Sequence, residues 1–295
     1  MKVALVYDRV NKWGGAERVL LALHELFPNA PLFTAVYHPQ KATWAKKFPE
    51  VIPTFLNKVS YFRDKHELLG TFTPIAFETL NLYDYDLVIS VTSEAAKGVI
   101  TKPPTTHICY CLTPTRYLWS HYDTYFKGPT FKAVSKPVVL YLRHWDRIAA
   151  QRPDVMVAIS SAVQKRIEKY YKRESKIIYP PVEVEKFRSK GTGQMRDNFF
   201  LVVSRLTPYK RVDLAIEAFN ELGFPLVIAG TGREEARLKS MAKKNVKFVG
   251  ELTDRLLAQY YKRCSALIFP QEEDFGLTAV EAQAAGAPVI AYGKG

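Results

Sequence analysis

Residues 266–286 read ALIFPQEEDFGLTAVEAQAAG, and they contain one complete strand-loop-helix step of an α/β fold. Ala266–Phe269 is a short apolar run that is typical of a buried strand. An acidic loop with a glycine follows, and Thr278–Ala285 has helical spacing that ends at Gly286. A strand that leads through a short loop into a helix predicts a parallel sheet with helices on its faces.

The same alternation extends through the second half of the chain. We expect a helix over Val212–Asn220 that stops near Gly223, and a helix that Thr253 caps and that continues through Tyr261. Further strands are expected at Phe199–Val203, Pro225–Ala229, Val246–Val249 and Pro288–Tyr292. The second half therefore predicts a doubly wound, Rossmann-like domain.

The first half gives the same signals less clearly. Lys2–Tyr7 is expected to be a strand and Ala16–Leu26 an amphipathic helix, whereas residues 37–86 hold many aromatic and basic residues without a clean period. Further strands are expected at Leu87–Val91, His107–Cys111 and Val155–Ile159. The fold class predicted for the chain is α/β, with two Rossmann-like domains.

A domain boundary is expected between the two runs of alternating strands and helices. Tyr179-Pro180-Pro181 stops regular structure, and Ser189–Asp197 is polar and contains glycine. We place the domains at residues 1–190 and 191–295. Two such domains leave a cleft between them, and ligands of open parallel sheets bind beyond the carboxyl ends of the strands.

The charge of the chain limits its partners. A formal net charge of +13 favours phosphate in some form, on nucleic acid, an anionic membrane or a small substrate. The basic residues are spread along the chain, so no nucleic-acid partner is expected. Apolar runs such as Val138–Leu142 are far shorter than the roughly 20 residues of a spanning helix. Lys2–Tyr7 is no signal peptide, and a cytoplasmic location is expected.

No metal site or familiar catalytic motif is expected. Cys109, Cys111 and Cys264 lack metal-binding spacing and favour an interpretation as reduced core residues. The chain contains no H-E-x-x-H, G-x-S-x-G, G-x-G-x-x-G or Walker A sequence. The six histidines are scattered, and none is assigned a role.

Two loops of the second half hold the strongest candidates for chemistry. Arg205 and Lys210 follow the strand that ends at Val203, where cations could neutralise a diphosphate. Glu273 and Glu281 flank a helix start, and paired carboxylates suit sugar or ribose diols. The free amides of Leu277 and Thr278 would form an anion site. A solvated acidic loop and a basic turn are the alternative interpretation, and the carboxylate spacing alone does not separate the two.

Glycines mark two further candidate loops. Gly14 and Gly15 stand between a strand and a helix, where backbone could approach a phosphate or sugar closely. An ordinary turn is the commoner meaning of such a pair. Gly230 begins the turn that leads from a strand into a charged helix, and it is a candidate for donor binding as well.

Together these segments resemble family 4 of the retaining glycosyltransferases, which have the two-domain GT-B fold. The resemblance covers essentially the whole chain, and its most specific element is the E-x7-E spacing of Glu273 and Glu281 together with Phe275-Gly276. It also includes Gly14–Arg18, Pro114–Trp119, Tyr179–Val182, Ser204–Arg211 and Gly286–Val289. The motif sequences are most similar to those of mannosyltransferases that use GDP-mannose.

The resemblance implies a metal-independent transferase that needs no cofactor. It would move a hexose, with mannose favoured, from a nucleotide-diphosphate sugar to a glycan or lipid-linked acceptor with retention of configuration. Arg205 and Lys210 would bind the diphosphate and stabilise it as leaving group, while Glu281 would hold the ribose and Glu273 the transferred sugar. Backbone groups of Phe275, Gly276, Leu277 and Thr278 would complete the diphosphate site.

Two departures from the family pattern bear on activity. Leu112 stands where the family usually has a histidine near the donor sugar, and the chain stops after the strand at Pro288–Tyr292, where relatives continue. We therefore expect the second domain to be incomplete. A nucleotide-sugar-binding protein with little or no turnover is the alternative to the transferase.

The acceptor side gives a weaker signal. Basic and aromatic residues are frequent in residues 37–86 and 115–145, which favours a lipid-linked acceptor or an anionic membrane surface. A peripheral location at the inner face of the membrane would follow. An ordinary hydrophobic helix face accounts for the same pattern.

Overall fold

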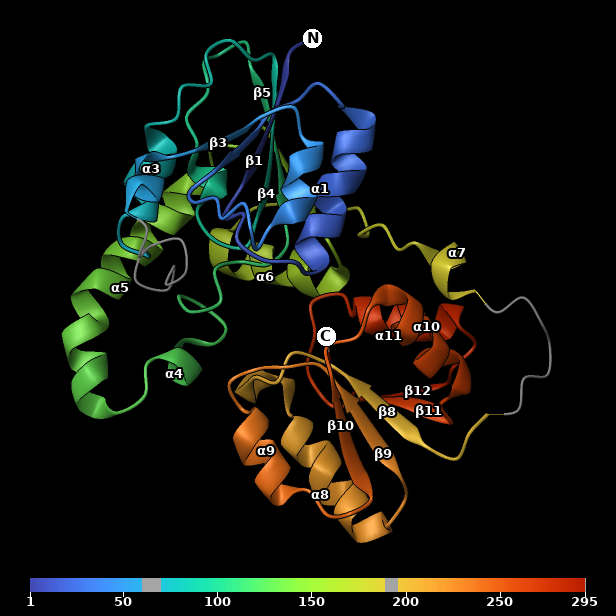
Figure 1. Ribbon diagram of the computed structural model, residues 1–295. Helices are drawn as coiled ribbons and strands as arrows, with labels where there is room; N and C mark the ends of the chain where they lie inside the picture. Colours follow the sequence, from blue (N-terminus) through green and yellow to red (C-terminus); the bar gives the residue numbers. More distant parts are fainter. Residues whose placement is uncertain (60–69, 189–195, 295) are drawn as a thin grey trace. The chain divides into compact units, whose positions relative to one another are not determined.

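The computed structural model describes residues 1–59, 70–188 and 196–294, which form two compact units, Met1–Pro181 and Val182–Gly295. Each unit is built on its own parallel sheet with helices around it (Figure 1). The predicted α/β class with two Rossmann-like domains is confirmed. The predicted boundary after residue 190 falls in 189–195, outside the described residues.

The second unit begins early because its first helix packs into its core. Helix α7, Val184–Phe187, follows the proline pair directly and contacts α10 and α11. Phe187 is fully buried, and its ring lies 5.8 Å from that of Tyr261 in a T-shaped pair. This aromatic contact ties the segment after Pro181 to the second core.

The first sheet has seven parallel strands in the order β3-β2-β1-β4-β5-β6-β7. Its central strands are the ones that the sequence predicts, whereas the short β2, β3 and β7 were not expected. The strands are β1 Val3–Tyr7, β2 Leu32–Thr34, β3 Val51–Pro53, β4 Leu87–Thr92, β5 Thr106–Cys111, β6 Val155–Ala158 and β7 Lys176–Ile177. Cys109 and Cys111 of β5 are buried and unbonded to each other, as expected for packing residues.

Helices cover this sheet, and α1 confirms the expected helix near the N-terminus. The α-helices are α1 Gly15–Leu26, α3 Thr73–Glu78, α4 Tyr122–Tyr125, α5 Pro129–Ala149 and α6 Ser161–Tyr171, and the short 3₁₀ turns are η1 Thr43–Lys47, η2 Phe55–Lys58 and η4 Ala96–Gly98. Helix α5 has 21 residues and was not predicted. It begins where Gly128 takes a left-handed conformation (φ +83°) and Pro129 occupies the first helical turn.

The second sheet has five parallel strands in the order β10-β9-β8-β11-β12, and all five were predicted. They are β8 Phe200–Val203, β9 Leu226–Ala229, β10 Val246–Gly250, β11 Ala266–Phe269 and β12 Val289–Ala291. The helices are α7, α8 Val212–Leu222, α9 Glu235–Met241, α10 Asp254–Arg263 and α11 Leu277–Ala284, with the 3₁₀ turn η5 Pro208–Lys210. Helix α10 has the expected cap, because the Thr253 hydroxyl accepts from Leu256 N at 3.4 Å.

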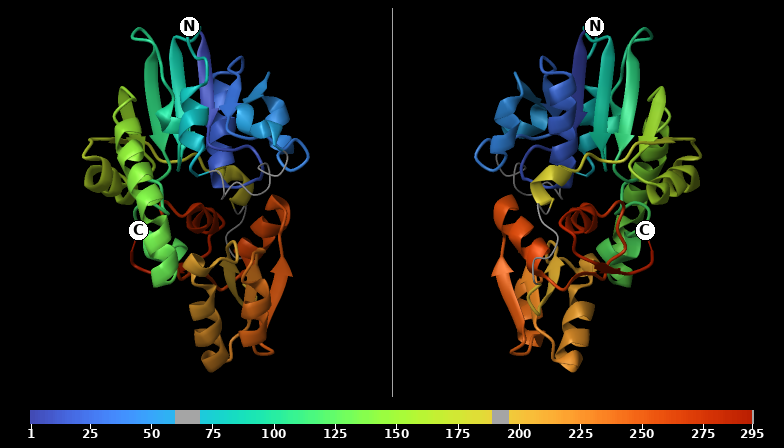
Figure 2. Two further views of the ribbon diagram at one scale, coloured as in Figure 1. Left: turned by 90° about the vertical axis from the view of Figure 1, so that its left-hand side faces the viewer. Right: turned by 90° about the vertical axis from the view of Figure 1, so that its right-hand side faces the viewer.

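Two cores lie on opposite faces of the second sheet. Consecutive residues of β8 alternate between them, so Leu201 packs with α7, α10 and α11, whereas Val202 packs with α8 and α9. Figures 1 and 2 show these helix pairs on the two sides of the sheet. Within the part of the chain that the structure describes, no helix is long and apolar enough to cross a lipid bilayer.

Candidate functional site

The strand order of the second sheet defines where a ligand would bind. From β8 the chain moves outward to β9 and β10, and it then returns to the other side of β8 with β11. The loops after β8 and β11 therefore leave neighbouring strands in opposite directions at the carboxyl edge. In doubly wound sheets this switch point is where ligands bind. The loops that follow Val203 and Phe269 carry Arg205, Lys210 and Glu273, and helix α11, which follows the second loop, carries Glu281.

The loop after β8 presents two cations in different surroundings. Arg205 is exposed, and its guanidinium donates to the Tyr209 hydroxyl at 2.8 Å. Lys210 closes η5 with only 9% of its surface exposed, and its ammonium lies 5.3 Å from the centre of the Tyr209 ring. The two cations predicted to bind the diphosphate, here called the clamp, are thus an exposed arginine and a buried lysine that lies against an aromatic ring.

Lys210 and Glu273 meet directly. The Lys210 ammonium donates to the Glu273 carboxylate across 63 residues of sequence, and both side chains are largely buried. The sequence predicted separate roles for the two groups, whereas the structure pairs them. Lys210 therefore already has a carboxylate partner in the absence of a ligand. An incoming anion would share or displace this partner.

Helix α11 begins at the same edge of the sheet. Gly276 precedes it in a left-handed conformation (φ +85°), which glycine adopts without strain. Its Cα is packed so closely that a Cβ would lie 3.3 Å from the Phe269 ring. The amides of Leu277 and Thr278 stand in the first turn, where helix geometry provides no internal acceptor. The structure thus places these amides at a helix N-terminus, where anions can bind, and that they bind an anion stays a prediction.

Glu281 lies one turn further into α11 and is almost fully buried, with 2% of its surface exposed. The hydroxyl of Tyr261, from α10, donates to Glu281 Oε2 at 3.2 Å. Tyr261 was not among the predicted site residues. No local signal marks it, because it occupies an ordinary apolar position of an amphipathic helix.

The structure shows why position 230 requires glycine, which the sequence did not reveal. Gly230 has φ +129°, and a Cβ would lie 1.9 Å from the carbonyl oxygen of Ser204. Gly232 approaches Leu206 in the same way, with 2.3 Å to its carbonyl oxygen. The two glycines let the loop after β9 pack directly on the loop that carries Arg205.

Gly14 and Gly15 belong to the first unit. Gly14 is the residue before α1 and has extended backbone, which any residue adopts. A Cβ there would lie 3.1 Å from the Glu17 carboxylate, and that carboxylate accepts from the Tyr7 hydroxyl at 2.9 Å. The structure therefore explains Gly14 by close packing against Glu17.

The first sheet has its own switch point, between β1 and β4, and an internal carboxylate occupies it. Asp8 follows β1 and is 5% exposed. Its oxygens accept from the Thr92 hydroxyl at 2.8 Å and from four consecutive backbone amides at 2.7–3.0 Å, those of Ser93, Glu94, Ala95 and Ala96. Such a ring of amides is an anion-binding nest. Here the chain fills it with Asp8.

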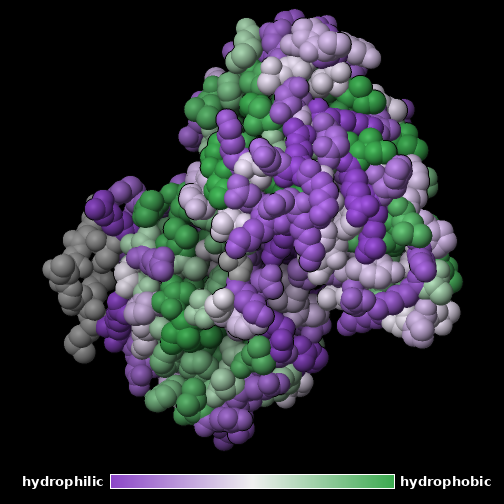
Figure 3. Space-filling view, turned by 180° about the vertical axis from the view of Figure 1, so that it is seen from behind, coloured by the Kyte–Doolittle hydropathy of each residue, from purple (hydrophilic) through white to green (hydrophobic). Residues whose placement is uncertain are grey.

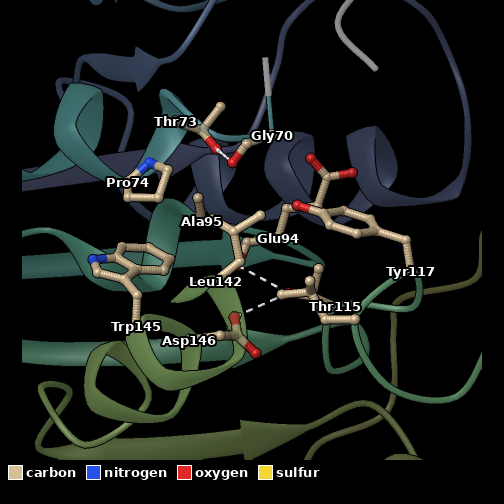
Figure 4. Close-up of a pocket in the computed structure, with 11 residues that line it drawn as sticks. Gly70, Thr73, Pro74, Glu94, Ala95, Thr115, Tyr117, Leu142, Trp145 and Asp146 are labelled. Atoms are coloured by element: carbon tan, nitrogen blue, oxygen red, sulfur yellow. Dashed lines mark hydrogen bonds between the residues drawn. The ribbon is translucent and has the colours of Figure 1, made fainter. Parts of the chain in front are cut away.

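A buried ion pair lies beside this nest, and Figure 4 shows its acidic member, Asp146, next to Thr115. Lys97 and Asp146 are each 1% exposed, and their charged atoms are 2.6 Å apart. Although burial lowers the pKa of Lys97, the adjacent carboxylate of Asp146 raises it and prevails. Asp146 also accepts from Thr115 at 3.0 Å and from the Trp119 indole at 2.7 Å. These bonds join α5 to the loop that contains Pro114–Trp119, and the adjoining cavity holds only about 10 Å³.

Leu112 directly follows β5 and is half-buried. Its amide donates to the carbonyl of Thr92 at 2.8 Å, which continues the pairing of β5 with β4. The side chain that differs from the family pattern therefore stands at the carboxyl edge of the first sheet. Among the residues with described positions, no group of three or more histidine, cysteine or acidic side chains is arranged to hold a metal ion.

Comparison with known families places the second unit. Residues 183–295 match the family described as Glycosyl transferases group 1. These residues are almost the whole of the unit Val182–Gly295. The match to this family therefore falls on the second unit.

Individual relatives share parts of their length with this chain. An uncharacterized glycosyltransferase of Methanocaldococcus jannaschii is 27% identical over 154 residues, which are 50% of this chain and 43% of that protein. O-antigen chain mannosyltransferase C of Escherichia coli is 33% identical over 101 residues, 32% of this chain and 27% of that protein. The chain thus spans less than half the length of these curated relatives.

Solved structures match the fold along the whole chain. Alr3699/HepE of Anabaena, solved in complex with UDP and glucose, covers 100% of this chain and 82% of its own, with a TM-score of 0.67 and 19% identity. This likeness shows the fold, and the expected GT-B class is confirmed.

Proposed function

We propose that this chain transfers a hexose from a nucleotide-diphosphate sugar to a glycan or lipid-linked acceptor, with retention of configuration. The proposal rests on which residues lie at the switch point of each sheet. In the second unit, Arg205, Lys210 and the first amides of α11 stand where a diphosphate would bind. In the first unit, Asp8 already occupies the corresponding nest. The residues that match the glycosyl transferases group 1 family coincide with the unit that contains Arg205 and Lys210.

Each side chain receives a role that suits its surroundings. Arg205 and Lys210 would bind the diphosphate together with the backbone of Phe275–Thr278. Glu281 would accept hydrogen bonds from the ribose hydroxyls, and Glu273 would hold the transferred sugar. The Lys210–Glu273 contact brings the group assigned to the phosphate next to the group assigned to the sugar. That adjacency suits a donor whose sugar is bonded directly to the phosphate.

In the reaction, the bond between the sugar C1 and the diphosphate oxygen breaks as a bond to the acceptor oxygen forms. The leaving diphosphate keeps the electron pair, so negative charge grows on its oxygens. Preplaced cations stabilise this charge more in the transition state than in the bound donor. The acceptor hydroxyl attacks on the face of the sugar from which the diphosphate leaves and passes its proton to a leaving phosphate oxygen, so the configuration is preserved. No metal or cofactor is needed in this scheme.

For the donor we favour GDP-mannose. Support comes from the Tyr209–Asp213 and Glu273–Gly276 sequences, which are similar to those of mannosyltransferases, and from the partial match to an O-antigen chain mannosyltransferase. Alr3699/HepE was solved with UDP and glucose, so a uridine donor belongs in the same panel. Thermal-shift measurements with GDP-, UDP- and ADP-sugars would select the base.

The clamp is tested by replacing its cations. A hydrogen bond to a charged group contributes about 1.5–3 kcal/mol, and loss of a preorganised oxyanion donor lowers rates by roughly 10²–10³-fold. We expect Arg205→Ala and Lys210→Ala to slow transfer or donor hydrolysis by about that factor. Calorimetry should show that they weaken nucleoside-diphosphate binding more than nucleoside binding. Glu281→Ala should weaken both ligands alike, because its proposed partner is the ribose.

Lys244→Ala is the matched control. Lys244 is exposed in the same unit but precedes β10, so it lies at the amino edge of the sheet. Its replacement should change neither rate nor affinity. If both clamp variants bind the diphosphate as tightly as the parent chain, the site is assigned to the wrong edge and the proposal fails.

A nucleotide-sugar-binding protein with little turnover is the second candidate. The observation that favours it is Leu112, which stands at the carboxyl edge of the first sheet in place of the family's usual histidine. Donor binding without hydrolysis or transfer to any acceptor would support this function. In that case Leu112→His should raise turnover and leave nucleotide affinity nearly unchanged.

A further inference from the structure

We infer that α4 and the first half of α5, residues 122–138, form a surface that binds an anionic lipid bilayer. This α4–α5 tip belongs to the first unit and contains none of the side chains assigned to the donor. Its binding is therefore a property separate from sugar transfer, although a lipid-linked acceptor would give it a purpose.

Large apolar side chains are exposed along one side of the tip. Phe131 is 56% exposed, Val134 73% and Val138 43%. Their spacing of three and four residues places them on the same face of α5. Tyr125 of α4 adds a ring that is 50% exposed. A contiguous exposed apolar surface of this kind marks an interaction site.

The tip extends away from the sheet of its own unit. Figures 1 and 2 show α4 and the start of α5 beyond the ends of the strands, whereas the second half of α5 lies against the unit. Inside the tip, the Phe126 ring lies 4.9 Å from Tyr122 and 5.7 Å from Phe131. These ring contacts hold the tip together, so its exposed face is preformed.

The charge of the tip selects the partner. Lys127, Lys132 and Lys136 lie within ten residues, and the acidic group nearest to them in the tip is Asp123, which is paired with Lys132 at 2.5 Å. Each lysine near an anionic bilayer contributes attraction. A second copy of the tip would instead bring lysines against lysines. Aromatic and apolar residues flanked by lysines are the composition of helices that lie in a bilayer interface.

The tip is too short to span a bilayer, so it would bind at the bilayer surface. The exposed part of α5, Pro129–Val138, is about half of the roughly 20 residues that a spanning helix needs. Helix α6 offers a contrast within the same unit. It has exposed lysines, but its apolar stripe is buried, and hydrophilic side chains predominate on the face of the unit where it lies (Figure 3).

The test measures binding of the full chain to vesicles of phosphatidylcholine alone and with about 30% phosphatidylglycerol, a fraction that gives an anionic surface. We expect binding to the anionic vesicles only, weakened by salt. Replacing Phe131, Val134 and Val138 together by serine should lower the partition coefficient at least tenfold at low and high salt. Equal binding to both vesicle types, or none to either, overturns the inference.

Two lysine variants distinguish binding through the tip from binding through the basic charge of the whole chain. One variant replaces three lysines of the tip by glutamine, Lys127, Lys132 and Lys136. The matched control replaces three exposed lysines on or beside α6, Lys165, Lys169 and Lys172. The tip variant should bind anionic vesicles roughly 100-fold less tightly at low salt, at about fivefold per lysine, and the control should change little. Equal losses in both variants overturn the assignment to the tip.

Self-association is the competing use of this face. If light scattering shows concentration-dependent dimers that the triple-serine variant abolishes, and vesicles are not bound, the surface belongs to a second copy and the inference fails. Donor binding is measured on the same variants. Since the tip lies outside the proposed donor site, unchanged donor affinity is expected, and the two proposals can fail independently.

Discussion

At the scale of single residues, burial sets the protonation state of His107 in β5. The side chain is fully buried, and its Nε2 lies 2.9 Å from the hydroxyl of Ser90 on the neighbouring strand. Burial lowers the pKa of His107 from 6.5 to about 4. The imidazole is therefore neutral in the folded chain at pH values where the unfolded chain already binds a proton.

This difference makes the first unit sensitive to acid. Between pH 6.5 and 4 the unfolded state binds more protons than the folded state, so stability falls as the pH is lowered. From pH 7.5 to pH 5 the loss from this group is about 2 kcal/mol. We expect His107→Gln, which can still reach Ser90, to remove that part of the acid loss in urea titrations. Equal pH dependence of the two proteins would show that His107 titrates normally.

Tyr261 matters at the same scale because of its bond to Glu281. If Glu281 binds the ribose, the tyrosine is a positioning residue that fixes the carboxylate. Removing one hydrogen bond to a charged group, Tyr261→Phe should weaken nucleoside-diphosphate binding by about 10-fold or more. The effect should be much smaller for a 2′,3′-dideoxy nucleotide, which lacks the hydroxyls that Glu281 would bind.

Tyr260→Phe is the control for this variant. Tyr260 is the adjacent residue of α10, is half-buried, and packs its ring against Phe199 at 6.0 Å. Its replacement should leave both affinities unchanged. A Tyr261→Phe chain that loses affinity for the ribose and dideoxy ligands equally has a general structural defect, and the positioning role is then rejected.

At the scale of elements, the packing of two loops in the second unit depends on glycine. Gly230 and Gly250 both have positive φ, but only Gly230 faces backbone, with Ser204 O where its Cβ would be. Gly250 has nothing within 4 Å of that position. Comparing substitutions at the two glycines therefore separates the strain of a left-handed backbone from the steric clash of a Cβ with Ser204.

We expect Gly250→Ala to destabilise the second unit by about 1–2 kcal/mol, which is the left-handed strain alone. Gly230→Ala should cost several kcal/mol more, because the loops after β8 and β9 must separate. That separation moves Arg205, so donor affinity should fall in this variant and be kept in Gly250→Ala. Chemical denaturation followed by donor titration measures both effects. Similar losses in the two variants would contradict the close approach.

At the scale of the whole molecule, the positions of the tryptophans allow unfolding of the first unit to be followed separately. All four tryptophans lie in Met1–Pro181, at Trp13, Trp44, Trp119 and Trp145. Tryptophan fluorescence therefore reports on the first unit, whereas far-UV circular dichroism reports on both. A ligand that binds the folded state at 100 times its Kd stabilises it by about 2.7 kcal/mol.

Because the proposed donor site lies in the second unit, a nucleoside diphosphate should act on that unit first. We expect the circular-dichroism melting curve to gain a component that moves up by roughly 10 °C, while the fluorescence transition moves less. The Lys210→Ala chain should show neither shift. Identical shifts by both probes would mean that the nucleotide stabilises the whole chain as one cooperative body.

Much of the fold followed from local sequence patterns. The five strands of the second sheet are short apolar runs bounded by glycine, proline or polar residues, and all were predicted. Strands β2 and β3, by contrast, have three residues each, which is too few for a period to show. Helix α5 was missed because Pro137 interrupts its interior and its apolar residues are on exposed as well as buried sides.

The sequence by itself determined the α/β class, the strands of the second unit with the helices between them, and the segments after β8 and β11 that carry Arg205, Lys210, Glu273 and Glu281, but not helix α7. These features are local, because turn residues and hydrophobic periods act within a few positions of the chain. Only the tertiary structure decided which of these groups touch. The Lys210–Glu273 pair joins residues 63 apart, the Tyr261–Glu281 bond 20 apart, and the Lys97–Asp146 pair joins η4 to α5. Such contacts depend on strand order and on packing across elements, which no local pattern records.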